Sequence, residues 1–453
     1  MKPSLTLIAI LFFASAAIQG QEKPAAAGTA DSASPAGLLG GGVLHYDLRF
    51  SETARFGDFQ GDQQESYFSG DASYADQSKR LPFNMQYGGG YGWVWAGEPS
   101  GGNLYQHLAL SQGMVWRAWN VNANDSVSYT FQTPTTGFSG VPGTGESIGG
   151  SGSTTPPDQT ILTVNTRTLD NLTTVAAGDR LDHATTLNFG GSAGEIRYID
   201  NNGQDMNTLT ANASVSRRLN ARNSISSEYS FSRYGYSGTS TAIQTNTLQL
   251  SLSRQWSRPF TTTVSAGPMW YSNSGIASSG GVATPNSTML ALSATANYSM
   301  RRESAGVNYF HGTTGGSGFM LGEKFDSVSA NFSREFGRNL TVGSTGSYMR
   351  TSSLIAYNIP ESCPNGATPP CYAQIGYTPD TRSFYGGVQA TRKLGRYMNA
   401  FANYTLIDQS SNLQVQISTP ILQLTGNANI LNGMYQVIGF GIGYSPREKR
   451  FKR

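Results

Sequence analysis

The chain has 453 residues, of which 13% are charged and 11% aromatic, with 54 glycines and a formal net charge of +3. About a quarter of the residues in a typical soluble domain are charged, so this composition does not favour one. The aromatic content is too high for an intrinsically disordered chain. The small net charge, without a dense Lys/Arg patch before the tail, excludes a nucleic-acid-binding class.

The N-terminus has the layout of a secretory signal peptide, which we predict at 1–20. Lys2 is followed by the apolar run LTLIAILFF (5–13) and then by small residues. This run is too short to cross a bilayer as a helix, which takes roughly 20 apolar residues. The next segment, 21–42, is rich in Ala, Gly, Ser and Pro, so we expect a flexible periplasmic leader there.

From Val43 onward, segments with a period of two recur along the chain. In TLQLSLSRQW (247–256) three leucines alternate with Gln and Ser, and 288–300 and 326–334 repeat the pattern. Successive strand residues point to opposite faces, so one face is apolar and the other is small, polar and almost uncharged. Aromatic residues gather near the segment ends, as in the girdles of membrane barrels: Trp256, Tyr298, Phe332, Tyr348, Tyr404 and Tyr444.

Short basic connections alternate with long polar ones in this part of the chain. The short ones are 216–224, 253–260, 299–306, 333–340 and 391–398, and the long ones include 134–160, 273–286, 352–380 and 409–431. Short turns at one end and longer loops at the other are typical of a barrel that spans a membrane. We therefore predict an all-β fold, a single large antiparallel up-and-down transmembrane β-barrel over 43–445.

We expect about eighteen strands, with sixteen as the alternative, and a barrel of that size encloses an aqueous lumen. The strands are expected to begin near residues 43, 65, 83, 103, 125, 160, 183, 206, 223, 243, 260, 287, 304, 322, 339, 381, 397 and 432.

With its signal peptide, basic turns and last strand, the chain resembles bacterial outer-membrane β-barrels, porin-like proteins, as a class. The last strand, MYQVIGFGIGYSPR, is similar to the terminal strand that barrel-assembly machinery recognises, although the chain continues as a basic periplasmic tail, 446–453. The resemblance implies a bacterial outer-membrane location, with outer-membrane lipid and the assembly machinery as partners, and a possible homo-oligomer. The basic turns also look similar to those of uncharacterised large barrels associated with exopolysaccharide loci.

Two cysteines, Cys363 and Cys371, lie in the Pro- and Gly-rich segment SCPNGATPPCY. In an oxidising compartment we expect this pair to close a small loop by a disulfide. A zinc site is the less favoured alternative, because two cysteines without a nearby histidine cannot complete four ligands.

No catalytic constellation is visible, so we predict neither enzymatic activity nor a cofactor or metal. Asp182 and His183 are adjacent but lie at a predicted turn. The candidate functional surface is instead the polar face that would line the lumen: Glu228, Gln249, Ser251, Ser253, Ser293, Thr295, Asn297, Ser327, Ser329, Asn331, Thr345, Gln389 and Asn403. Four aromatic residues are candidates for the same face, where they would stack on sugar rings or fill space: Tyr271, Tyr385, Phe401 and Tyr435.

A lumen lined by Ser, Thr, Asn and Gln offers hydrogen bonds and little ion selectivity. This favours a porin-like channel for passive diffusion of small hydrophilic, neutral solutes. Two alternatives stay open: a conduit for exopolysaccharide export, and a structural or adhesive barrel acting through its long extracellular loops. For the loop at 134–160 two predictions stay open: it folds inward as a constriction of the lumen, or it lies outside the barrel.

Overall fold

We analysed a computed structural model of the chain. It describes residues 42–57, 62–76, 78–97, 101–132, 166–199, 204–237, 241–274, 281–282, 287–316, 321–361, 371–377, 380–412, 432–446 and 449–450. The predicted signal peptide, all of the leader but Gly42, the connection at 134–160 and Cys363 lie outside these residues. Among the described residues, no helix is long and apolar enough to cross a membrane.

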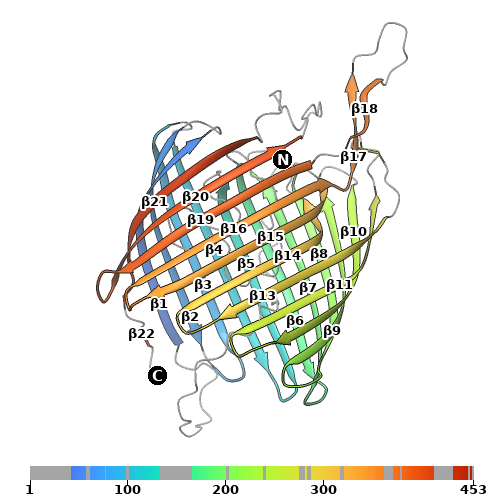
Figure 1. Cartoon of the computed structure of the whole chain (residues 1–453), viewed down its shortest axis with the longest axis horizontal. Coiled ribbons are helices and arrows are strands. Elements are labelled where there is room, and N and C mark those ends of the chain that lie inside the picture. Colours follow the sequence, from blue (N-terminus) through green and yellow to red (C-terminus); the bar gives the residue numbers. More distant parts are fainter. Residues whose placement is uncertain are drawn as a thin grey trace, which may run out of the picture.

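Eighteen long strands form the barrel wall in the described part of the chain (Figure 1). They are β1 (Gly42–Gly57), β2 (Gln63–Asp76), β3 (Phe83–Ala96), β4 (Gly101–Val115), β5 (Trp119–Gln132), β6 (Thr166–Arg180), β7 (Thr185–Tyr198), β8 (Met206–Arg218), β9 (Asn223–Tyr236), β10 (Ala242–Gln255), β11 (Phe260–Ser274), β13 (Ser287–Ser299), β14 (Glu303–Gly316), β15 (Leu321–Phe336), β16 (Leu340–Ser353), β19 (Asp380–Lys393), β20 (Met398–Ser411) and β21 (Gly433–Tyr444).

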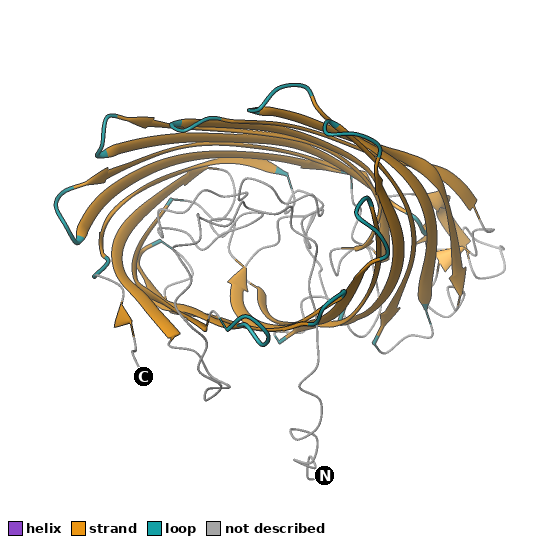
Figure 2. Ribbon diagram, turned by 90° about the horizontal axis from the view of Figure 1, so that it is seen from below, coloured by secondary structure: helices purple, strands orange, loops and turns teal. Residues whose placement is uncertain are grey.

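The barrel closes because β1 pairs antiparallel with both β2 and β21, the first and last neighbours of the wall. Every other wall strand pairs antiparallel with its neighbours along the chain, and Figure 2 shows the strands surrounding an oval interior. The two-residue strand β22 (Lys449–Arg450) adds a short pairing to the start of β1. The predicted all-β barrel of eighteen strands is confirmed, and the sixteen-strand alternative is wrong.

Two strand starts differ from the expected ones. β5 begins at Trp119 instead of near 125, because a three-residue turn, in which the Trp116 amide donates to the Trp119 carbonyl (2.8 Å), lets pairing resume early. β6 begins at Thr166 instead of near 160.

The long connection predicted at 352–380 contains strands of its own. β17 (Ala356–Glu361) and β18 (Cys371–Tyr377) form a bulged hairpin, and β12 (Gly281–Val282) pairs with β17. Figure 1 shows β17 and β18 above the rim where the long connections lie, which we call the loop rim. Cys371 is the first residue of β18, and the disulfide with Cys363 stays a prediction.

The apolar face of the strands is the outer surface of the barrel. Leu250, in the middle of β10, is 57% exposed although it is a large aliphatic residue. The strand registers carry this face round the wall, because Leu252 lies opposite Val264 and Tyr348 lies opposite Phe384, and all four side chains are exposed. An apolar outer band of this kind is what lipid requires of a barrel.

Candidate pore interior

The polar strand face lies opposite the apolar one, and all the residues predicted to line a lumen are on it. In β10, Gln249, Ser251 and Ser253 alternate with the exposed leucines. The registers place Glu228 opposite Gln249, Ser265 opposite both Ser251 and Ser293, Thr295 opposite Thr263, Asn297 opposite Thr261, Ser329 opposite Ser347, Asn331 opposite Thr345, and Gln389 opposite Asn403. Ser327 shares this face of β15 with Ser329. Their contact with a solute stays a prediction.

Hydrogen bonds between neighbouring strands organise this polar face. The Ser251 hydroxyl donates to Ser265 Oγ (2.9 Å), and the Thr263 hydroxyl donates to Ser253 Oγ (3.1 Å). The Asn212 amide donates to the Glu228 carboxylate over 3.4 Å. These pairs hold their side chains in place while leaving the other donors and acceptors to meet water or a solute.

One open hollow brings several predicted residues together. Its lining includes Thr345, Tyr385, Gln389 and Asn403. The Tyr385 hydroxyl is hydrogen-bonded to Thr345 and Thr405, so the ring is fixed against the wall. Phe401 is likewise buried on the polar face, and the side chain of Tyr435 lies outside the described residues.

The structure adds a charged group on β1 and β2 that the sequence analysis missed. Arg49 pairs with Asp47 (2.7 Å) and with Asp71 (3.3 Å). Further along the same strand face, Arg55 acts electrostatically on Glu65, and both side chains are buried. The Tyr67 hydroxyl also donates to Glu65. The inner face therefore departs from the almost uncharged surface that the sequence led us to expect.

A segment that we call the inward tip, residues 313–316, 321–323 and 354–355, folds over part of the inner face. β14 stops pairing with β13 after His311 but continues to Gly316, so its end leaves the wall. The Tyr236 hydroxyl of β9 donates to the carbonyl of Gly315, although three strands separate β9 from β14. Strands lie about 4.8 Å apart, so this bond forms only if the tip folds over the inner face.

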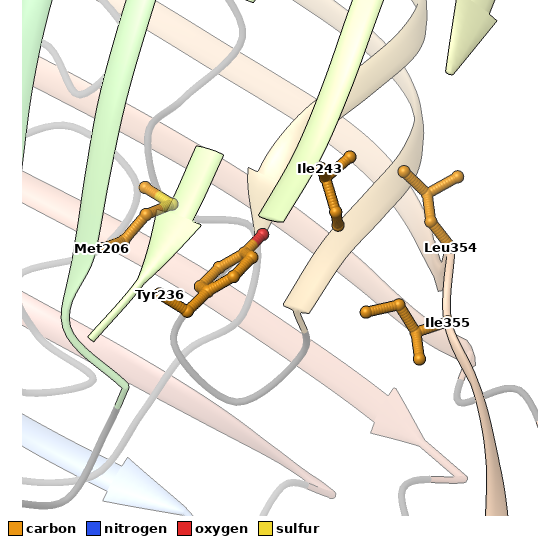
Figure 3. Packing of buried hydrophobic residues seen from close by; sticks show 5 residues of the cluster. All are labelled: Met206, Tyr236, Ile243, Leu354 and Ile355. Atoms are coloured by element: carbon orange, nitrogen blue, oxygen red, sulfur yellow. The ribbon is translucent and has the colours of Figure 1, made fainter. Parts of the chain in front are cut away.

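Packing of apolar side chains holds the inward tip in place (Figure 3). Ile243 of β10 and Ile355 of the tip are both fully buried (0% exposed), in a cluster with Met206, Tyr236 and Leu354. The Leu354 amide donates to the Gly322 carbonyl (3.0 Å), which joins the two parts of the tip. The glycine-rich sequence HGTTGGSG allows close approach, because a Cβ on Gly315 would lie 2.5 Å from Met206 Sδ.

The closed ring of strand pairings, the apolar exterior and the polar interior together define the architecture. The chain is a closed antiparallel β-barrel of eighteen strands. Solved structures with a similar arrangement include three proteins of Pseudomonas aeruginosa: OpdL (10% identity, TM-score 0.42, 89% of this chain and 98% of that one), OccK2 (OpdF) in complex with glucuronate (10%, 0.41, 89% and 98%) and OpdK with vanillate (10%, 0.43, 89% and 99%). No protein-family model and no curated protein matches the sequence.

The barrel uses Asp182 as a turn residue. Its carboxylate accepts hydrogen bonds from the amides of Ala184 (2.6 Å) and Thr185 (2.7 Å) and from the Thr185 hydroxyl (3.0 Å). These bonds favour the charged form and hold the pKa of Asp182 below its ordinary value. Asp182 and His183 thus lie in the β6–β7 turn, as expected, and Asp182 has a structural role there.

Two glycines at the same backbone angle provide a test of the inward tip. Gly322 and Gly337 both have φ = +68°, so alanine costs about 1–2 kcal/mol of strain at either position. At Gly322 the added Cβ would also overlap Ile243 Cδ1, whereas at Gly337 nothing lies within 4 Å. We expect Gly322→Ala to make the tip sensitive to protease and Gly337→Ala to leave it resistant. Equal protease resistance in both variants would contradict the packing of the tip against β10.

Proposed function

We propose that the barrel is a passive channel for small hydrophilic solutes, which cross the membrane through its lumen. The observation that supports this most strongly is the inner face of hydroxyl and amide side chains, set against an outer face of exposed leucines. In a barrel of this size a polar interior holds water, and water-lined pores admit hydrophilic solutes. On this proposal the barrel has no enzymatic activity, and its partner is the solute.

We further propose that the channel favours neutral solutes. The two inner arginines of β1 are compensated, because Arg49 lies between Asp47 and Asp71 and Arg55 lies beside Glu65. Arginines that are paired with carboxylates exert little net attraction on a passing anion. The Ser, Thr, Asn and Gln side chains of the remaining wall offer hydrogen bonds to sugar-like hydroxyl groups.

The inward tip supports a size limit on this channel. It lies across the inner face of β8, β9 and β10 and is held by a buried apolar cluster, so the space that it fills is closed to solute. The solutes proposed are therefore small ones. The hollow beside Tyr385 lies on β16, β19 and β20, away from the strands that the tip covers.

The experiment is conductance and solute flux of the purified full-length protein. In planar bilayers we expect stepwise conductance with weak selectivity between cations and anions. In liposome swelling we expect a neutral monosaccharide to enter faster than a uronate of the same size. Faster entry of the uronate would contradict the neutral preference while leaving the channel intact.

The same measurement addresses the other two functions. Blockade by a long polysaccharide, with little flux of monosaccharides, would favour a conduit for exopolysaccharide export. A protein that folds but conducts nothing would favour a structural or adhesive barrel. The β17–β18 hairpin, which stands above the loop rim in Figure 1, supplies the surface for that last role.

A further inference from the structure

The five short turns from β8 to β20 carry an excess of positive charge at the rim opposite the loop rim, which we call the turn rim. These turns and the strand ends beside them carry twelve cationic side chains and only two carboxylates, those of Glu303 and Glu335. The ten strands that they join are neighbours in the wall. The cations are Arg217, Arg218, Arg222, Arg254, Arg258, Arg301, Arg302, Arg334, Arg338, Arg392, Lys393 and Arg396, and all of them are exposed.

Four of these arginines repeat a sequence pattern that fixes their direction. SRRL, SRQW, SREF and TRKL each place an arginine two residues before a large apolar side chain at the end of a strand. Residues two apart share a strand face, so each arginine lies on the same face as the apolar residue. The four apolar residues are exposed on the outer surface: Leu219, Trp256, Phe336 and Leu394. The four arginines therefore point outward too: Arg217, Arg254, Arg334 and Arg392.

Two arginines stack on the ring that follows them. The guanidinium of Arg254 lies 4.0 Å from the centre of the Trp256 ring, and that of Arg334 lies 5.3 Å from the centre of the Phe336 ring. Aromatic rings at this position mark the lipid headgroup level of a barrel, and stacking holds each charge at that depth. The other arginines of the turn rim lie in the turns themselves, just beyond these strand-end arginines.

The loop rim shows what is different about the turn rim. Two outward arginines of the loop rim have close carboxylate partners within the protein, with Arg197 paired to Glu195 (2.6 Å) and Arg350 paired to Asp380 (2.7 Å). In the described part of the five turns and their strand ends, which form an arc of the turn rim, the shortest ion pair joins Arg334 and Glu303. The distance from the guanidinium nitrogen to the carboxylate oxygen is 3.9 Å. The positive charge of the arc is therefore left for an anion from outside the chain.

We propose that this arc of the turn rim binds the phosphate groups of anionic lipids in the adjoining leaflet. Guanidinium groups pair bidentately with phosphate, and a cation near an anionic lipid surface is worth enough to raise local binding roughly fivefold. The outward arginines reach headgroup phosphates beside the barrel, and the turn-tip arginines meet the same charged layer. A shell of anionic lipid around this half of the barrel would result.

Native mass spectrometry of the full-length protein in neutral detergent tests the proposal. With equimolar phosphatidylglycerol and phosphatidylethanolamine, the wild type is expected to retain several-fold more phosphatidylglycerol. The triple variant Arg254→Gln, Arg334→Gln, Arg392→Gln is expected to lose most of that preference. The matched loop-rim variant Arg350→Gln, Arg382→Gln is expected to keep it, because Asp380 already neutralises part of that charge.

A lysine variant and a folding check separate loss of the lipid site from loss of the fold. The triple lysine variant preserves the charge and should preserve the preference, and its loss in a folded protein would contradict a charge-based site. Folding of each variant is checked by its heat-dependent gel migration. Equal lipid retention by the wild type and the triple glutamine variant would overturn the proposal. So would arginine-dependent binding of a soluble anionic polysaccharide without any preference among lipids.

Discussion

Leu250→Arg is expected to lower the free energy of unfolding in phospholipid vesicles by about 2–4 kcal/mol. Leu250 is the middle one of three exposed leucines on the outer face of β10, so the new charge would lie near the centre of the apolar band. An arginine there is removed from water without a partner. Urea titration followed by tryptophan fluorescence measures the change.

The matched control is the next residue along the same strand. Ser251 lies on the inner face, where it is hydrogen-bonded to Ser265. Ser251→Arg places the same charge among polar groups, so we expect a change below about 1 kcal/mol in stability and a shift of channel selectivity toward anions. Similar losses of stability in both variants would contradict the assignment of the two faces.

Removing the apolar half of the inward tip is expected to open the lumen. In the double variant Leu354→Ser, Ile355→Ser the tip loses its contacts with Ile243, and a buried aliphatic side chain of this kind contributes about 2–5 kcal/mol. The wall strands keep their pairing, so the barrel itself should stay folded. Single-channel conductance should rise, and the tip should become sensitive to protease.

The control for this prediction changes two leucines that do not touch the tip. Leu219→Ser and Leu394→Ser act on exposed side chains at the turn rim. We expect their conductance to match that of the wild type. A tip variant that conducts like this control would show that residues 354–355 do not limit the pore.

The wall of the barrel could be predicted from the sequence because its signals are local. Leucine and serine alternate in 247–256 strongly enough to define both faces, and the arginine-containing turns mark the strand ends. The charged residues of β1 could also have been read in this way. In HYDLRFSETARFG, Arg49 lies between Leu48 and Phe50, and Arg55 precedes Phe56, so the alternation places both arginines on the face opposite the apolar one.

The inward tip could not be predicted, because nothing local distinguishes it. After His311, β14 continues as the glycine- and threonine-rich GTTGG, which could belong to any loop. The bend appears only in the contact between Gly315 and Tyr236, which are far apart in the sequence. The apolar pair Leu354–Ile355 resembles any loop residues until Ile243 covers it. Contacts of this kind depend on closure of the whole barrel, which a pattern of period two does not encode.

A water-filled lumen lined by the polar strand face predicts a clear result for thiol modification during conductance recording. In a background with Cys363→Ser and Cys371→Ser, single cysteines are placed at Ser251 and Leu250, and folding is checked by gel migration. A charged, membrane-impermeant thiol reagent should reduce current through the Ser251→Cys protein and leave the Leu250→Cys protein unchanged. Current loss from Leu250→Cys alone, or open channels that neither modification affects, would contradict the claim.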